Sequence, residues 1–230
     1  RGAQPASRPA ATTRLAAAIQ RTGATRPTAS ATMGTTHLAR NDRIMQWRNT
    51  PDTYGVAAKI LHWGIVLLII AQYVIIESAE DLPDGIEKLK TVSLHKSIGM
   101  LILGLALVRI LWRLANRGNP APVPMPPLQH KVAAAGHGLL YLLILAQPIT
   151  GWVMSSAADS PVTFFGLFQF PALVAENHDA HEFYEEVHEI LFNVLVVVAV
   201  LHALAALYHH FWMKDDSLRR MSLFGGRKRV

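Results

Sequence analysis

Four long apolar runs constrain the fold of this chain more than any other feature. They occupy residues 56–76, 92–112, 132–153 and 187–208. Each approaches or exceeds the ~20 apolar residues that an α-helix needs to cross the hydrocarbon core of a bilayer. Lipid forces the backbone hydrogen bonds to close within each segment, so spans of this kind are helical. The pattern predicts an all-α integral membrane protein built as a four-transmembrane-helix bundle.

The N-terminal segment 1–44 has a different composition from the rest. It is rich in Ala, Thr, Ser, Arg and Pro, and contains no acidic residue before Asp42. We interpret it as a disordered or non-native extension, with an organelle-targeting leader as the alternative, because such leaders are Arg-rich and acid-poor. The membrane domain is predicted to span residues 45–230.

The distribution of charge predicts an orientation. From Arg40 onward, Lys and Arg concentrate before the first run, in the Pro-rich loop after the second run and in the C-terminal tail. The other two loops are acidic. Because cytoplasmic loops of membrane proteins carry the excess of Lys and Arg, both termini are expected in the cytoplasm. The net charge of +6 therefore does not indicate a nucleic-acid partner.

Two histidines lie within the fourth run. His188 and His202 are fourteen residues apart. At ~100° per residue they share one helix face to within roughly 40° and differ in depth by about 21 Å. Ionisable side chains inside a membrane are costly and mark functional sites. One helix therefore presents an imidazole at each of two membrane levels.

Depth gives each of these imidazoles a partner on another helix. With the predicted orientation, His62 in the first run lies at the cytoplasmic level of His202, and His95 in the second run lies at the outer level of His188. Facing imidazoles can ligate iron, copper or zinc. The inner pair has no thiolate or carboxylate, which argues against a structural zinc site. A haem iron with two axial imidazoles fits better, because the apolar macrocycle can pack between helices.

Two such haems would stand about 20 Å apart along the bilayer normal and form an electron path across the membrane. Glycines at positions 64, 99 and 104 would let the macrocycles approach the backbone. The chain has no cysteine, so it cannot supply a disulfide, a c-type haem attachment or a thiolate ligand. A haem-free transporter or proton relay is the alternative interpretation of histidines in a membrane span.

Further polar residues lie at the inner level. Arg109 follows His95 by fourteen residues, so it is a candidate for contact with an inner haem propionate, or simply a cytoplasmic-side anchor. His137, His209 and His210 have no partner matched by depth. They are expected to be interfacial histidines, with propionate or quinone contact as the alternative for His137 and His209.

The long loop after the third run carries the aromatic sequence F-F-G-L-F-Q-F, which indicates a segment at the membrane interface. At the start of the fourth run, Glu185 and His188 have the spacing of a di-iron carboxylate motif, but that motif requires a second copy on another helix. We interpret the region around His178 and His181 as a solvated, acidic helix start.

Several short sequences around these histidines resemble one family. They are K-I-L-H-W at His62, S-L-H-K-S-I-G at His95, G-H-G-L-L-Y at His137, Q-P-I-T-G-W, V-H-E-I-L at His188 and L-H-A-L-A-A-L-Y-H-H-F-W at His202. From about Met45 onward the chain resembles the bacterial di-haem cytochrome b561 family, which is related to the b-type cytochromes of nickel–iron hydrogenases.

The resemblance implies a multi-pass protein of the bacterial inner membrane. It implies two haem b groups ligated by His62, His95, His188 and His202, and electron exchange with ubiquinone. Some members of the family are reported to oxidise superoxide at the outer face, so superoxide:quinone oxidoreductase activity is one expectation. The alternative is a membrane-anchor cytochrome that docks a soluble dehydrogenase or hydrogenase. The sequence predicts no oligomeric state.

Overall fold

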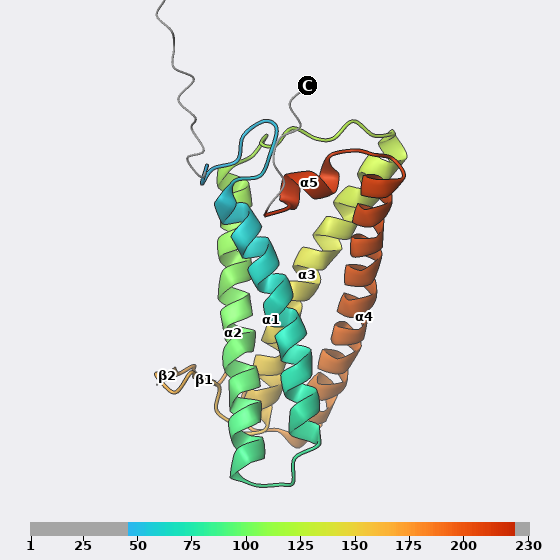
Figure 1. The fold of residues 1–230 in the computed structure, drawn as a ribbon. Coiled ribbons are helices and arrows are strands. Elements are labelled where there is room, and N and C mark those ends of the chain that lie inside the picture. Colours follow the sequence, from blue (N-terminus) through green and yellow to red (C-terminus); the bar gives the residue numbers. More distant parts are fainter. Residues whose placement is uncertain (1–45, 224–230) are drawn as a thin grey trace, which may run out of the picture. The chain divides into compact units, whose positions relative to one another are not determined.

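The computed structural model describes residues 46–223. The predicted 1–44 extension lies outside these residues. Within them the chain forms four long helices, a short two-stranded hairpin and one short C-terminal helix (Figure 1). The long helices are α1 (Val56–Glu80), α2 (Ile86–Ala115), α3 (Pro127–Ala157) and α4 (His178–Phe211). All four are long and apolar enough to cross a membrane. The prediction of a four-span helical membrane bundle is confirmed.

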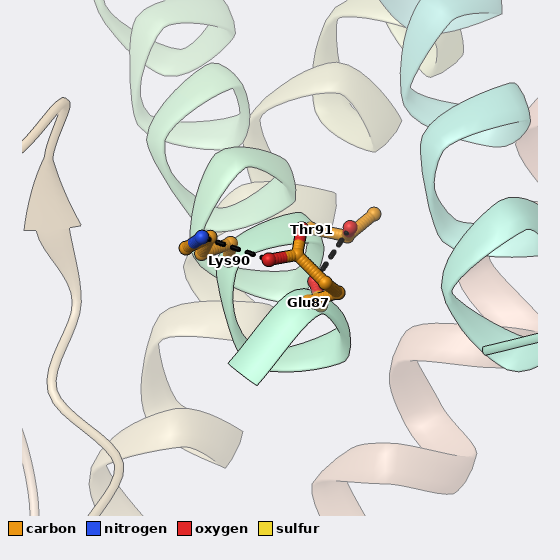
Figure 2. A network of polar contacts seen from close by, with 3 residues as sticks. All are labelled: Glu87, Lys90 and Thr91. Atoms are coloured by element: carbon orange, nitrogen blue, oxygen red, sulfur yellow. Dashed lines mark hydrogen bonds and ion pairs between the residues drawn. The ribbon is translucent and has the colours of Figure 1, made fainter. Parts of the chain in front are cut away.

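Each helix is longer than the apolar run that predicted it, because polar residues continue the helical backbone beyond the apolar core. The start of α2 shows how this occurs (Figure 2). There the Lys90 Nζ atom donates to Glu87 Oε1 at 2.8 Å, and the Thr91 hydroxyl donates to the Glu87 carbonyl at 2.9 Å. These side chains satisfy polar groups in a turn that precedes the apolar segment.

The helices pack as two neighbouring pairs. α1 packs on α2 and α3 packs on α4, while contacts between α2 and α3 join the pairs. Small residues are among the most buried in the bundle, including Ala58, Ser97 and Ala106, each at most 9% exposed. Small side chains let transmembrane helices approach closely, which is the usual way that helices associate where lipid removes the hydrophobic driving force. The packing therefore sets the distances between side chains on facing helices.

The outer surface of the bundle is apolar. Large hydrophobic side chains on every long helix are exposed, for example Leu67 at 65%, Leu111 at 65%, Leu142 at 62% and Val197 at 58%. Continuous apolar surface of this kind is unusual on a protein surrounded by water. It is the surface that a lipid environment covers.

Two small elements follow α3 and α4. The hairpin β1 (Thr163–Phe164) and β2 (Phe168–Gln169) is antiparallel and lies beside α2 (Figure 1). The aromatic segment of the long loop therefore forms this hairpin. The helix α5 (Ser217–Met221) turns back to the start of α1, where the Trp63 indole donates to the Met221 carbonyl at 3.0 Å.

Candidate haem-binding site

The structure brings the four predicted histidines together in two pairs, each across two helices. We call His95 with His188 the outer pair and His62 with His202 the inner pair, after the predicted orientation. The ring centroids of the outer pair are 6.5 Å apart, and the ring planes are at 75°. Those of the inner pair are also 6.5 Å apart, at 82°. The fourth helix α4 contributes one imidazole to each pair, as its helical period predicts.

A third histidine belongs to the inner level. The ring of His137 on α3 lies 5.2 Å from the ring of His202, centroid to centroid. The expectation that His137 has no partner matched by depth is wrong, because its ring lies beside that of His202 where α3 packs on α4.

Two glutamines, which the sequence analysis did not single out, hold the backbone of the outer pair. Gln72 on α1 donates from Nε2 to the carbonyl of His95 at 2.9 Å. Gln147 on α3 donates in the same way to the carbonyl of His188 at 3.0 Å. Thus α1 supports the backbone of His95 on α2, and α3 supports the backbone of His188 on α4. An amide within an apolar run is the signal that could have revealed both, since such groups seek interhelical hydrogen bonds in a membrane.

The ring of His188 has contacts of its own, in addition to the hydrogen bond at its backbone carbonyl. Its Nδ1 atom lies 3.1 Å from the Thr150 hydroxyl, which donates its own hydrogen to the Gln147 carbonyl at 2.9 Å. Both contacts are hydrogen bonds at once when Nδ1 carries the ring proton, because the hydroxyl then accepts from His188, and this tautomer leaves Nε2 free to ligate a metal. Next to Thr150, a Cβ atom at Gly151 would lie 3.0 Å from His188 Cε1 and 3.3 Å from Nδ1. The imidazole therefore packs tightly against Gly151.

The outer partner, His95, is held differently. Its Nδ1 atom is buried and has no hydrogen-bond partner among residues 46–223. Gln72 therefore fixes the position of His95 through its backbone, whereas Thr150 fixes the ring of His188 directly. The two imidazoles of the outer pair thus differ in their hydrogen bonding, and a metal between them would have two chemically unequal ligands.

Two other predicted residues point to different partners. Arg109 reaches toward α1 and donates from Nη1 to the Ala58 carbonyl at 3.2 Å, one turn before His62. Its side chain therefore faces the bundle at the inner level. His209 instead bonds Asp215 beyond the end of α4, with its Nδ1 atom 2.6 Å from Asp215 Oδ2. Burial raises the pKa of Asp215, but hydrogen bonds from Ser217 and His209 outweigh this and hold it below its ordinary value.

The acidic start of α4 forms local side-chain contacts between histidines and carboxylates. His178 Nε2 lies 3.3 Å from Glu182, and His181 Nε2 lies 3.9 Å from Glu185. Among residues 46–223, no group of three or more His, Cys, Asp or Glu side chains is placed to hold a metal ion. A metal bound between two facing imidazoles would therefore need its remaining ligands from outside the protein. A porphyrin supplies four.

The spacing of the paired rings fits a haem iron. An imidazole nitrogen lies about 2 Å from a bound metal, and the ring centroid lies about 1 Å further away, so two axial imidazoles stand about 6 Å apart. The observed separation is 6.5 Å in both pairs. At Gly64 and Gly104 an added Cβ would meet no protein atom within 4 Å, and the role of these glycines beside a macrocycle stays a prediction. Gly99 instead lies against Gln72, whose Nε2 atom would be 3.3 Å from its Cβ.

Paired imidazoles within an apolar four-helix bundle define the class of membrane b-type cytochromes. Comparison with known proteins places the chain within this class. A family model described as prokaryotic cytochrome b561 matches residues 53–223. The chain belongs to the prokaryotic cytochrome b561 family, which confirms the resemblance found in its sequence.

Similar proteins occur in several bacteria. The chain is 37% identical to "Cytochrome b561 homolog 2" of Escherichia coli K12 over 182 residues, covering 77% of this chain and 95% of the relative. It is 36% identical to "Probable superoxide oxidase CybB" of Yersinia pestis, covering 70% and 90%. It is 31% identical to "Cytochrome b562" of Cereibacter sphaeroides, covering 70% and 89%. The protein is a multi-pass bacterial membrane cytochrome, and its family uses haem b.

Proposed function

We propose that the protein carries two haem b groups and moves electrons across the bacterial inner membrane. In this proposal His95 and His188 ligate the outer haem, and His62 and His202 ligate the inner haem. Haem supplies the one-electron chemistry, and the protein positions it and tunes its electrostatics. The redox partner at the inner haem is a membrane quinone, and the outer haem exchanges electrons with a partner at the outer surface.

The observation that carries this proposal is the repetition of one geometry at two levels. Both pairs have the same 6.5 Å ring separation, and both use α4 for one ligand. The α4 ligands are fourteen residues apart, or about 21 Å along the helix axis. A single haem needs only one pair. Two equivalent pairs separated along the membrane normal support a conducting path.

At the inner level, Arg109 and His137 are candidates to contact the haem propionates or the quinone. Arg109 faces the bundle beside Ala58, and His137 lies against His202. A guanidinium can bind a carboxylate through two parallel hydrogen bonds, and an imidazole can donate a proton to a reduced quinone oxygen. His209 is a weaker candidate, because its Nδ1 atom is engaged by Asp215.

Superoxide is the outer-face electron donor that we propose, because the Yersinia pestis relative is described as a superoxide oxidase. The reaction balances with the proposed inner partner. Two superoxide anions each lose one electron and leave as two dioxygen molecules, while one quinone takes up two electrons and two protons to form a quinol. The haems would pass these electrons one at a time.

Haem stoichiometry in single-histidine variants tests the ligand assignment. A pyridine haemochrome assay on the purified protein is expected to give two haem b per chain. His202→Ala is expected to lose the inner haem and keep the outer one, and His188→Ala the reverse. Full retention of both haems in His202→Ala would contradict the inner pairing. A total of one haem in the unmodified protein would contradict the di-haem proposal.

Electron transfer is tested separately with the loaded protein. Superoxide generated in solution is expected to reduce the haems within vesicles, and added ubiquinone is expected to reoxidise them. If a quinol reduces the haems but superoxide does not, another outer partner is required. Co-purification of a large soluble dehydrogenase would then support the membrane-anchor alternative.

A further inference from the structure

The hairpin of β1 and β2 exposes large apolar side chains without any charge among them. Residues 163–171 contain no Lys, Arg, Asp or Glu, although the loop around them is acidic. Leu167 is 78% exposed, Phe168 53% and Phe165 46%. Phe164 packs against Phe168 and Phe170 within the hairpin, with ring centroids 5.4 and 6.3 Å away. The hairpin is thus an apolar element with an uncovered face.

This hairpin is attached to the side of α2 and not to its end (Figure 1). The Ser97 hydroxyl lies 2.9 Å from the Thr163 carbonyl and accepts a hydrogen bond from the Phe165 amide at 3.1 Å. Nearby, Lys96 donates to the Ser160 hydroxyl at 2.7 Å. Ser97 lies eleven residues beyond Ile86, where α2 begins, which is about 16 Å along the axis. It is five residues inside the apolar run 92–112, or about 7 Å.

Several backbone amides of the hairpin are hydrogen-bonded within the hairpin or to α2. Leu167 N donates to the Phe164 carbonyl and Phe170 N to the Val162 carbonyl, both at 2.9 Å. The Phe165 amide, which lies in the turn, is bound by Ser97. Non-helical backbone at membrane depth is tolerated only where protein groups satisfy its polar atoms. Ser97 performs that role for the turn.

The turn itself contains an unusual residue. Phe165 has φ of 49° and Gly166 has φ of 73°, so both central residues of the turn are in the left-handed region. Such turns ordinarily carry Asn or Asp followed by Gly, because a bulky side chain in that region is strained. Phe165 occupies this strained position with its ring half exposed. We interpret the ring as making an apolar contact that a polar turn residue could not make. An apolar surrounding would stabilise the ring.

We propose that residues 163–170 form a lipid-inserted hairpin. Phe165, Leu167 and Phe168 contact the acyl chains of the leaflet that surrounds the first turns of α2. The occupant of this apolar face is lipid and not a soluble protein, because Ser97 holds the hairpin beside the apolar run of α2 and the hairpin carries no charged side chain. The insertion gives the loop between α3 and α4 a second membrane anchor next to His95. This inference does not depend on haem or quinone.

Site-directed fluorescence tests the insertion. The chain has no cysteine, so a single introduced cysteine can be labelled without background. Leu167→Cys places a bimane label on the hairpin in the full-length protein, reconstituted in phosphatidylcholine–phosphatidylglycerol vesicles. The aqueous control is Glu182→Cys, 65% exposed at the start of α4. The lipid control is Val197→Cys, 58% exposed within α4. Quenching is measured with iodide in water and with lipids that carry a nitroxide on the acyl chain.

The label at position 167 is expected to behave like the label at position 197. It should emit at shorter wavelength than the label at position 182, be quenched by the nitroxide lipids and be protected from iodide. Iodide quenching equal to that at position 182 would overturn the proposal and place the hairpin in water. Protection from both quenchers would also overturn it and indicate that protein, such as a second copy of the chain, covers the hairpin.

Discussion

The imidazole of His188 has two neighbours on α3, Thr150 and Gly151, and the first can set its chemistry. In the tautomer with the proton on Nδ1, His188 donates to the Thr150 hydroxyl, which donates its own hydrogen to the Gln147 carbonyl. A hydrogen bond at Nδ1 raises the basicity of the opposite nitrogen and so makes the ring a stronger donor to a metal. An iron bound to His188 would then be stabilised in its oxidised state.

Removing the Thr150 hydroxyl is therefore expected to raise the reduction potential of the outer haem. Thr150→Val keeps the shape of the side chain and eliminates the hydrogen bond, while Thr150→Ser retains it as the matched control. Redox titration followed in the α-band is expected to show one of two haem components shifted upward in Thr150→Val and unshifted in Thr150→Ser. An unshifted titration in both variants would show that the bond does not tune the ligand.

The close approach of Gly151 to the same ring leads to a steric prediction. An added Cβ at Gly151 would lie 3.0 Å from His188 Cε1, closer than side-chain atoms normally approach. Overpacking of this kind typically costs about 1–3 kcal/mol. Gly151→Ala is expected to displace His188 and lower outer-haem occupancy, as measured by pyridine haemochrome assay. Gly136→Ala on the same helix is the control, because its Cβ meets no atom within 4 Å, and it should leave the outer haem bound. Equal occupancy in both variants would contradict the prediction.

The residues that could be predicted from sequence are those fixed by helical period and depth. The spacing of His188 and His202 along one helix predicted that each would meet a histidine of another span, and the structure brings both pairs to 6.5 Å. The proximity of His137 to His202 could not be predicted, because it depends on the rotation of α3 about its axis. The same holds for Thr150, whose neighbour is 38 residues away in sequence.

At the scale of elements, the bilayer makes long spans predictable and leaves short elements unconstrained. The four helices follow from run length, because lipid permits few alternatives for the backbone. The hairpin has strands of two residues each, and α5 has five residues, so neither carries a periodic signal of its own. Both are held by distant partners, the hairpin by Ser97 and α5 by Trp63.

The attachment of α5 contains an acid-sensitive contact. Asp215 binds His209 through Oδ2 and the Ser217 amide through Oδ1, and it lies in the turn that leads from α4 to α5. Burial raises the pKa of Asp215, but the hydrogen bonds from Ser217 and His209 lower it by more, so the pKa in the folded protein is below its ordinary value. A depressed carboxyl pKa contributes stability above the unfolded value, and that stability is lost as the pH falls through the folded value.

We therefore expect the position of α5 to be independent of pH above the ordinary carboxyl range and to loosen in strong acid. Leu223→Cys, which is 51% exposed, carries a bimane label close to Trp63, whose indole holds the end of α5 and quenches the dye at short range. Fluorescence should be low at neutral pH and rise below the ordinary Asp pKa of about 4. Adding Asp215→Asn should give high fluorescence at all pH values. Low fluorescence in that variant at neutral pH would show that Asp215 does not hold α5.

For the whole molecule, the distribution of charge predicts which end faces the cytoplasm. Cations gather from the end of α2 to the start of α3 and after α4, and acids gather from the end of α1 to the start of α2 and at the start of α4. These cations include Arg113, Arg117, Lys131, Lys214, Arg219 and Arg220, and the acids include Glu77, Glu80, Asp81, Asp84, Asp179 and Glu182. The positive-inside rule then places the ends of α2 and α4 in the cytoplasm. His95 and His188 lie near the opposite surface.

Topology reporters test this orientation, and the outcome decides the order of the electron path. Alkaline phosphatase is expected to be active when fused after Asp81 and inactive when fused after Val230, whereas green fluorescent protein should fluoresce only after Val230. The physical reason is the cost of moving the basic tail outward across the membrane against the potential, about 2.3 kcal/mol per charge per 100 mV. Active phosphatase after Val230 would invert the assignment. The outer pair would then face the cytoplasm, and an extracellular donor would meet His62, His137 and His202 first.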